Sequence, residues 1–239
     1  MIEKHLMKLR ARDDISAEEE RALRDAIGEV IDYPADHTFI TAGRELHAST
    51  LLVDGFLCRY KDLSGGQRQI TEIHTPGDFA DLHSFTLKYL DHNVMALTPS
   101  RVVQVPHDKL AAITENHPHL ARLLWFMTNL DAAIHREWEV SLGRRSAIER
   151  TAHLFCELQV RLGVVGLASA RDYALPITQS ELAECLGLTS VHVNRVLREL
   201  RERELVEFRS GRVMIADLAG LKRVAEFDPA YLYLDKRAR

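Results

Sequence analysis

Cysteine is scarce in this chain of 239 residues, which contains only Cys58, Cys156 and Cys185. They lie far apart and form no C-x-x-C pair, so the sequence predicts neither a disulfide framework nor a zinc or iron–sulfur site within one chain. Long hydrophobic runs are also missing. No segment approaches the roughly 18 apolar residues of a membrane span, and the amino terminus has no signal-peptide core. We therefore expect a protein of the reducing cytoplasm with no membrane segment.

The positive charge typical of nucleic-acid-binding proteins is missing too, because 31 Lys and Arg stand against 35 Asp and Glu, a formal net charge of −4. The distribution is uneven. Residues 1–143 carry 15 basic and 22 acidic residues, whereas residues 144–239 carry 16 basic and 13 acidic residues. An acidic first part and a basic second part indicate separate roles, although a chance fluctuation of a few charges would give the same split.

The composition that is present, 46% hydrophobic and 28% charged, is typical of a globular protein with one or two domains. Residues 1–30 form a predicted helical lead, in which Ser16 and Glu19 make a capping box. Short apolar runs separated by Gly, Pro and Asp turns then extend from Tyr33 to Pro106. This pattern predicts an antiparallel β-sandwich or barrel.

A long helix is predicted from Pro118 to about Ser141. Its apolar residues recur in steps of three and four, close to the repeat of a coiled coil, which favours a dimerisation seam. The predicted seam residues are Leu120, Leu123, Met127, Leu130, Ile134 and Trp138. The alternative is a helix whose apolar stripe is buried against its own domain. Gly143 and the residues after it are expected to end this helix.

Residues 177–200 have the spacing of a helix-turn-helix. Thr178 and Glu181 form a capping box that opens a short helix, and Gly187 suits the sharp turn that follows. Thr189 is a suitable amino-terminal cap for the second helix. The expected shared core consists of Leu182, Leu186, Leu188, Val193 and Val196, with the small Ala183 at the helix crossing. A generic helical hairpin is the alternative.

The second helix of such a unit enters the major groove of DNA with its first turns nearest the bases. Arg195 can donate two hydrogen bonds to guanine, Asn194 can pair with adenine, and Val191 can contact a thymine methyl group. Ser190 lies beside them on the outer face. Contacts to bases are therefore expected from this part of the helix.

Phosphate contacts are expected from Thr189, His192 and Arg198, which position the protein without specifying sequence. Arg198 could instead form an i, i+4 ion pair with Glu202. Beyond the helix, residues 205–215 are typical of a strand, a tight turn and a strand, the wing of a winged helix. The residues expected on a phosphate strand are Arg209, Ser210 and Arg212, although a solvated turn without DNA contact is the alternative.

These motifs, in this order, resemble the Crp/Fnr family of bacterial transcription regulators over nearly the whole chain. In the first half the matching residues are Gly43, Leu52 to Gly55, Gly65 to Ile70 and Pro76 to Phe79. The resemblance implies an α+β fold with three parts. They are a helical lead and an antiparallel, jelly-roll-like β-roll sensor domain over residues 1–117, a dimerisation helix over residues 118–143, and a winged helix-turn-helix DNA-binding domain over residues 144–239.

The chain departs from the cyclic-nucleotide binders of that family. No Arg-Ser or Arg-Thr pair follows Gly77-Asp78 before Val94, so a cyclic phosphate would meet Asp78, Asp81 and Asp91 instead of an arginine. Cyclic AMP is therefore not expected, and no cofactor is predicted. Haem is an open alternative because ten of the twelve histidines precede residue 143, although scattered surface histidines give the same count.

Two further departures concern oxygen sensing and DNA. The amino-terminal cysteine cluster of oxygen-sensing members has no counterpart before Cys58. The family's Glu-x-x-Ser-Arg motif in the recognition helix is replaced by Val191-His-Val-Asn-Arg195, so the family's usual target sequence cannot be assumed. Residues 227–234 have no predicted role beyond folding back on a domain.

The sequence thus predicts a homodimeric, sequence-specific DNA-binding transcription regulator that recognises a pseudo-palindrome, with its activity set by an unidentified effector at the β-roll. Its expected partners are double-stranded DNA, a second copy and, for an activator, RNA polymerase. The alternative is a ligand-binding or interaction module that has lost specific DNA recognition. An enzyme is not predicted, because no catalytic arrangement or phosphate-binding glycine loop is evident.

Overall fold

The computed structural model describes residues 1–238 of the chain. These residues form two compact units that each combine distant parts of the sequence. Unit 1 contains Met1–Lys61, Ile73–Ala133 and the residues from Tyr233 onward, whereas unit 2 contains Asp62–Glu72 and Ile134–Leu232. The division into domains at residues 117 and 143 stays a prediction. Within residues 1–238, no helix combines the length and the apolar character needed to cross a bilayer.

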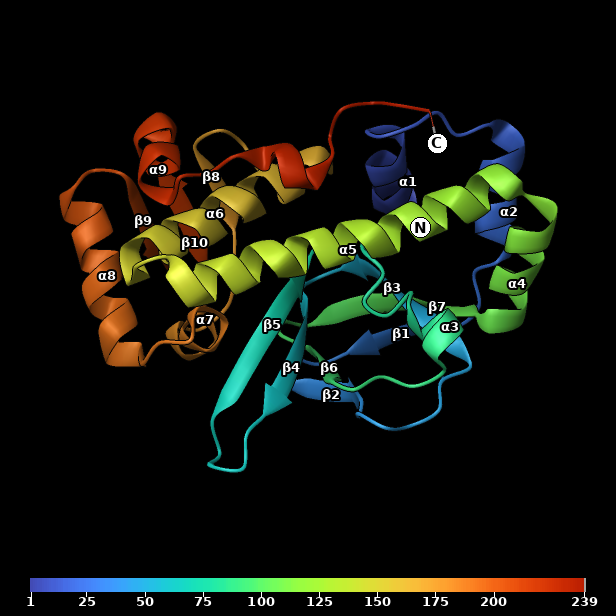
Figure 1. Cartoon of the computed structure of the whole chain (residues 1–239), viewed down its shortest axis with the longest axis horizontal. Coiled ribbons are helices and arrows are strands. Elements are labelled where there is room, and N and C mark those ends of the chain that lie inside the picture. The colour runs from blue at the N-terminus through green and yellow to red at the C-terminus, as the bar shows by residue number, and fades with distance from the viewer. Residues whose placement is uncertain (239) are drawn as a thin grey trace. The chain divides into compact units, whose positions relative to one another are not determined.

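The strands of the first half form two antiparallel sheets with the orders β1-β7-β3 and β2-β6-β4-β5 (Figure 1). Their bounds are β1 (Val30–Tyr33), β2 (His37–Ile40), β3 (Ala48–Asp54), β4 (Leu57–Asp62), β5 (Arg68–His74), β6 (Asn93–Ala96) and β7 (Ser100–Pro106). Five of these strands lie at apolar runs expected from the sequence. Strands β1 and β6 are short and were not distinguished from turns.

A single apolar core joins the two sheets, as expected for a β-roll. It contains residues from β2, β3, β4, β6 and β7, which belong to both sheets. The buried core residues are Ile40, Leu52, Leu57, Ala80, Leu90, Val94, Ala96 and Val102. Because strand residues alternate between faces, these side chains come from the inner face of each sheet, and the core fixes the sheet pairing.

Four shorter helices surround these sheets: α1 (Glu3–Arg10), α2 (Ala17–Asp25), α3 (Ser84–Leu87) and α4 (His107–Asn116). The predicted capping box at α2 is confirmed, because the Ser16 hydroxyl accepts from the Glu19 N–H and the Glu19 carboxylate accepts from the Ser16 N–H. The lead predicted over residues 1–30 is therefore two helices, not one.

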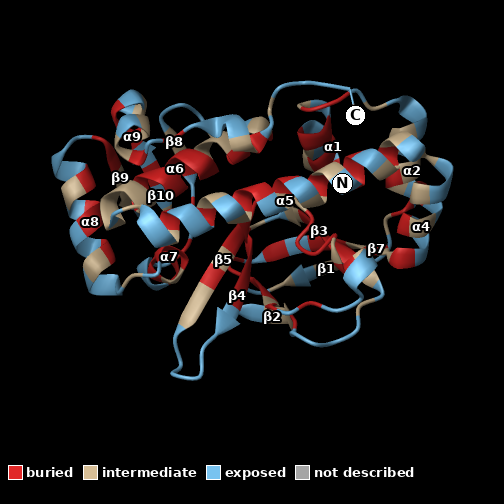
Figure 2. Cartoon of the chain, viewed as in Figure 1, coloured by how far each residue is buried: buried red, intermediate tan, exposed pale blue. Residues whose placement is uncertain are grey.

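Helix α5 (Pro118–Arg144) is the longest helix of the described chain and is buried along one side only (Figure 2). It passes through Gly143, where the sequence predicted its end. The break falls at the next capping box, in which the Ser146 hydroxyl accepts from the Glu149 N–H and starts α6 (Ala147–Val164). One glycine in the last turn costs about 1 kcal/mol, which a long helix tolerates.

The predicted winged helix lies in unit 2. Its remaining elements are β8 (Asp172–Ala174), α7 (Gln179–Leu186), α8 (Ser190–Glu202), β9 (Val206–Arg209), β10 (Arg212–Ile215), α9 (Leu218–Ala225) and the 3-10 helix η1 (Pro229–Leu232). The strands form an antiparallel sheet in the order β8-β10-β9. Beyond α9, Phe227 and Leu232 are buried, so the carboxy-terminal segment folds back on unit 2 as expected.

Candidate DNA interface

The predicted helix-turn-helix is present, with each local signal in place. The Thr178 hydroxyl accepts from the Glu181 N–H at 3.1 Å and begins α7. Gly187 follows α7 with a φ of +59°, a left-handed conformation that glycine adopts without steric cost. The Thr189 hydroxyl accepts from the His192 N–H at 3.2 Å and begins α8. These three positions set the angle between the two helices.

The expected shared core of α7 and α8 is also present. All but one of its residues are less than 5% exposed, and Leu188 in the turn is half-buried. The buried members are Leu182, Ala183, Leu186, Val193 and Val196. Since these residues occupy the inner face of α8, its opposite face is free for a ligand.

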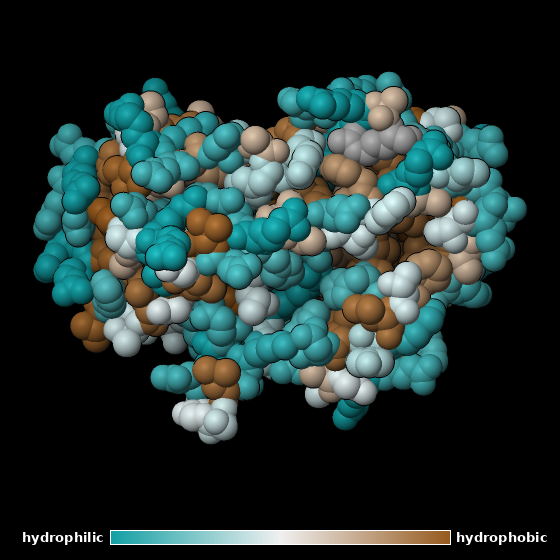
Figure 3. Space-filling model, in the orientation of Figure 1, coloured by the Kyte–Doolittle hydropathy of each residue, from teal (hydrophilic) through white to brown (hydrophobic). Residues whose placement is uncertain are grey.

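The outer face of α8 presents the predicted DNA-contacting residues to solvent. Exposed there are Thr189, Ser190, Val191, Asn194, Arg195 and Arg198, and His192 is half-buried. Val191 is 81% exposed, the highest value among the large apolar residues of the described chain. Figure 3 shows a mainly hydrophilic surface over the edge of the molecule where α8 lies. An apolar side chain in such a position has no packing role within the chain.

Two of these residues make contacts within their own helix. The Asn194 amide Nδ2 donates to the Ser190 carbonyl at 3.0 Å, so a bidentate contact with adenine would require this bond to break. Arg198 Nε lies 3.9 Å from the Glu202 carboxylate, the alternative that the sequence left open. Arg195, by contrast, has no ion pair with any of residues 1–238.

The wing is a tight hairpin between β9 and β10. Ser210 and Gly211 both have positive φ, at 52° and 70°, as the two-residue turns that match strand twist require. Arg209 at its tip is exposed. Arg212 is exposed as well, but it forms an ion pair with Asp172 on β8, so a phosphate would have to compete with this carboxylate.

The predicted dimerisation seam lies on the buried side of α5 in the single chain. All six of its residues are buried inside the single chain, with exposed fractions of 1% to 8%, and cannot meet a partner without unpacking. They are Leu120, Leu123, Met127, Leu130, Ile134 and Trp138. The most apolar stripe of the helix is therefore part of the chain's own core, which was the alternative to a dimer seam.

The opposite side of α5 has its own repeat of three and four residues. The exposed positions at this spacing are Pro118, Arg122, Trp125, Asn129, Ala132, Arg136, Glu139 and Gly143, and Val140 and Arg144 beside them are exposed as well. Trp125 is 70% exposed, whereas Trp138, the other tryptophan of the helix, is 6% exposed. A stripe with this spacing is the geometry of a coiled-coil seam, and here it is mixed in polarity.

The cations of unit 1 near the Gly77-Asp78 turn are bound by the chain itself. Lys8 of α1 is 4% exposed, and its Nζ lies 2.6 Å from the Asp78 carboxylate. Arg59 of β4 is 2% exposed, and it donates to the Ala80 carbonyl at 2.9 Å and to the Asp131 carboxylate at 2.7 Å. Neither cation is available to clamp a phosphate in this arrangement.

The residues after that turn are held by internal hydrogen bonds. Asp81 is fully buried, and its carboxylate accepts from the Thr50 N–H at 2.5 Å. Burial raises the pKa of Asp81 to about 7, against the lowering effect of the Thr50 hydrogen bond and of the Arg59 charge. The Ser84 hydroxyl and His107 Nε2 are 3.3 Å apart beside it. This segment is therefore packed as protein core.

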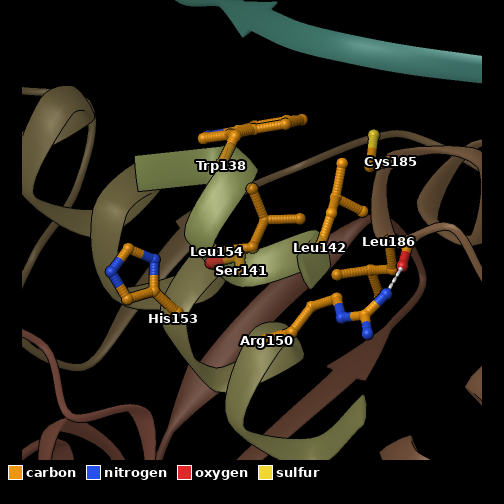
Figure 4. Close-up of a pocket in the computed structure, with 8 residues that line it drawn as sticks. All are labelled: Trp138, Ser141, Leu142, Arg150, His153, Leu154, Cys185 and Leu186. Atoms are coloured by element: carbon orange, nitrogen blue, oxygen red, sulfur yellow. Dashed lines mark hydrogen bonds between the residues drawn. The ribbon is translucent and has the colours of Figure 1, made fainter. Parts of the chain in front are cut away.

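A small cavity lies in unit 2 between α5, α6 and the end of α7 (Figure 4). It measures about 20 Å³, enough for one water molecule and far too small for a nucleotide. Its lining residues are Trp138, Ser141, Leu142, Arg150, His153, Leu154, Cys185 and Leu186. Burial lowers the pKa of His153 to about 4, so this imidazole is neutral at physiological pH.

Comparisons with known proteins match both halves of the chain. A model of the cyclic nucleotide-binding domain matches residues 30–117, and a model of the Crp-like helix-turn-helix domain matches residues 149–224. The solved structure of FixK2 from Bradyrhizobium japonicum is similar at a TM-score of 0.75 and 26% identity, over 82% of this chain and 96% of that one.

Curated relatives give the same result. The transcriptional activator FnrA of Stutzerimonas stutzeri is 27% identical over 171 residues, which are 72% of this chain and 70% of FnrA. The transcriptional activator FnrL of Cereibacter sphaeroides is 28% identical over 216 residues, 88% of this chain and 86% of FnrL.

A β-roll of the cyclic-nucleotide-binding type followed by a winged helix-turn-helix defines a DNA-binding transcription regulator with an effector-type domain. The chain belongs to the Crp/Fnr family of regulators. Members of this family bind DNA as dimers and are not enzymes, which confirms the predicted fold class, DNA partner, homodimer and absence of catalytic function.

Proposed function

We propose that this regulator recognises DNA sequence through the outer face of α8, with Arg195 as its principal base-contacting residue. The proposal rests on one observation. Arg195 is exposed and free of ion pairs within residues 1–238, whereas Asn194 and Arg198 contact other residues of α8. A free guanidinium can donate two hydrogen bonds to guanine O6 and N7. Val191 would contact a thymine methyl group. The proposed phosphate contacts come from Thr189, Ser190, His192, Arg198, Arg209 and Arg212.

The homodimer is proposed to form along the exposed stripe of α5. Trp125, Asn129 and Ala132 stand at its centre, and their spacing matches a coiled-coil seam. A two-fold axis along this helix would present two copies of α8 to half-sites roughly 34 Å apart on one face of the duplex.

The effector is proposed to be something other than cyclic AMP. Lys8 and Arg59 are already paired with Asp78 and Asp131, and no arginine follows Gly77 in the segment that would hold the phosphate. His107, one of the buried histidines, is engaged with internal hydroxyl groups and is not proposed as a haem ligand. The relatives FnrA and FnrL are called transcriptional activators, which supports an activator. For an activator, RNA polymerase is the expected partner, and a cytoplasmic location is part of the proposal.

Selection of binding sites from random duplexes tests the proposal for α8. Wild-type protein should enrich a two-fold symmetric sequence, and Arg195→Ala should lose discrimination at one base pair per half-site by about 1–3 kcal/mol. Arg203→Ala removes the same charge just after the carboxyl end of α8, where Arg203 pairs with Glu199, and is the matched control, expected to keep the sequence preference. No enrichment by the wild type, or identical preference in Arg195→Ala, would contradict the proposal.

A further inference from the structure

The end of α7 is completed by side chains from outside the helix-turn-helix. The last carbonyl groups of a helix have no partners within the helix and must find them elsewhere. In α7 the Ala183 carbonyl accepts from the Leu188 N–H at 3.0 Å, which closes the turn. The carbonyls of Glu184, Cys185 and Leu186 remain, and they lie immediately before the turn that directs α8.

Gln69 supplies two of these hydrogen bonds. It lies on β5, in the outer part of the β4–β5 hairpin, which belongs to unit 2 together with the helix-turn-helix. Its amide Nε2 lies 2.8 Å from the Glu184 carbonyl and 3.4 Å from the Cys185 carbonyl. Nε2 also lies 2.8 Å from the carbonyl of its neighbour Ile70, which fixes the side chain on the strand. Because the amide has two hydrogens, they serve the Glu184 and Ile70 carbonyls, and the more distant Cys185 carbonyl shares one of them.

Arg150 of α6 supplies the hydrogen bond to the last of these carbonyls, that of Leu186. Its Nη1 donates to the Leu186 carbonyl at 2.5 Å, the bond drawn as a dashed line in Figure 4, and its Nη2 donates to the Arg145 carbonyl at 3.1 Å. A charged donor on a helix carboxyl end also opposes the negative end of the helix dipole. Gln69 and Arg150 thus hold three successive carbonyl groups of α7.

The turn itself is closely packed against the same side chains. A methyl group added at Gly187 would lie 3.3 Å from Gln69 Oε1 and 3.2 Å from Leu142 Cδ2. The turn therefore cannot shift toward the hairpin without displacing Gln69. Because Thr189 begins α8 two residues later, the position of the turn fixes the direction of the helix that faces DNA.

We propose that Gln69 is a positioning residue for DNA recognition: the β4–β5 hairpin holds the helix-turn-helix turn through this amide and so sets the placement of α8. The proposal rests on the proposed function of α8. Strand β4 of this hairpin pairs with β6 in the four-stranded sheet, so a rearrangement of that sheet would reach the helix-turn-helix turn through the hairpin and the hydrogen bonds of Gln69.

The decisive variant is Gln69→Glu, which keeps the size of the side chain but replaces the amide donor with a carboxylate facing two carbonyl oxygens. Gln67→Ala, an exposed position on the same hairpin, is the matched control. We expect Gln69→Glu to lower affinity for the selected duplex about tenfold, equivalent to roughly 1.4 kcal/mol, with affinity for an unrelated duplex unchanged. A merely structural role would lower both affinities and the global stability together.

Hydrogen exchange provides a measurement that does not require DNA. In Gln69→Glu the backbone amides of residues 186–192 should exchange severalfold faster than in the wild type, and in Gln67→Ala they should not. Unchanged exchange in Gln69→Glu overturns the positioning role even if α8 recognises no specific sequence. Faster exchange without any specific DNA binding by the wild type would instead contradict the proposed function alone.

Discussion

The indole Nε1 of Trp138 donates to both carboxylate oxygens of Glu157, at 3.1 and 3.2 Å. Glu157 is fully buried, and it also accepts from Arg161 Nη1 at 2.9 Å and from the Tyr231 hydroxyl at 2.8 Å. Burial and this carboxylate together raise the pKa of Tyr231. One buried carboxylate therefore ties α5, α6 and the carboxy-terminal segment into unit 2.

Removal of that charge should be strongly destabilising. Glu157→Gln leaves the buried Arg161 guanidinium without its closest carboxylate, and we expect a loss of about 3 kcal/mol in the free energy of unfolding. Urea denaturation followed by circular dichroism measures it. Tyr231→Phe is the control, because it removes one hydrogen bond and leaves the ion pair, and should cost about 1–2 kcal/mol. Equal losses in the two variants would contradict this description.

The two sides of α5 should respond differently to substitution. Ala132→Glu places a charge on the exposed stripe and should shift the protein toward single chains, with little change in the stability of each chain. Leu123→Ala opens a cavity in the core and should cost about 2–5 kcal/mol of unfolding free energy. Sedimentation equilibrium and denaturation separate these effects. If Ala132→Glu remained fully dimeric, dimerisation along this stripe would be wrong.

His119 should make the stability of unit 1 depend on pH. Its Nδ1 lies 2.6 Å from the Glu19 carboxylate and its Nε2 lies 3.2 Å from the Asp13 carboxylate. Burial lowers the pKa of His119, but these two hydrogen bonds outweigh it and raise the pKa above the ordinary 6.5. The stabilisation is complete below pH 6.5 and is lost as the pH rises through the raised pKa.

Denaturation at a series of pH values from about 5.5 to 9 tests this contribution. The wild type should lose roughly 0.5–1 kcal/mol more than His119→Gln over that range, a size typical of partly exposed ion pairs. The Glu19 carboxylate contributes a pH dependence of stability with the opposite sign. Burial raises its pKa but hydrogen bonds from Ser16 and His119 lower it overall, so its contribution fades only at acidic pH. Parallel curves for the two proteins would exclude a role for His119.

Val191 should determine one position of the DNA site. Val191→Glu introduces a carboxylate that can accept from cytosine N4, whereas valine can only contact a methyl group. We expect the selected half-site to change at the single base pair facing residue 191, while its dependence on Arg195 remains. Comparison of sequences selected by the two proteins measures this. A change spread over the whole half-site would indicate that α8 has moved instead.

Local signals in the sequence were sufficient for the helix-turn-helix. Capping at Thr178 and Thr189 and the left-handed turn at Gly187 depend on a few neighbouring residues, so each could be recognised from spacing alone. Strand β1 could not, because Val30–Tyr33 lies where the predicted helical lead gives way to the predicted strand region.

The sequence could not determine which side of α5 faces a partner, for a physical reason. A stripe of leucines at coiled-coil spacing has the same pattern whether it packs on a second copy or within its own chain. Only the fold shows that Leu123 and Trp138 are buried and that Trp125 is exposed. The role of Gln69 was equally hidden, because its partners at Glu184 and Cys185 lie more than a hundred positions away in the sequence.

Because the exposed stripe of α5 is mixed in polarity, promoter occupancy should depend steeply on the concentration of this protein. Seams that contain Asn129 and Arg136 beside Trp125 associate more weakly than seams of leucine, so on the proposed pairing dimers remain in equilibrium with single chains. A palindromic DNA site binds two copies of the chain. While single chains predominate, promoter occupancy then rises with the square of their concentration. A change in the cellular amount of this regulator would therefore change promoter occupancy steeply, even without an effector.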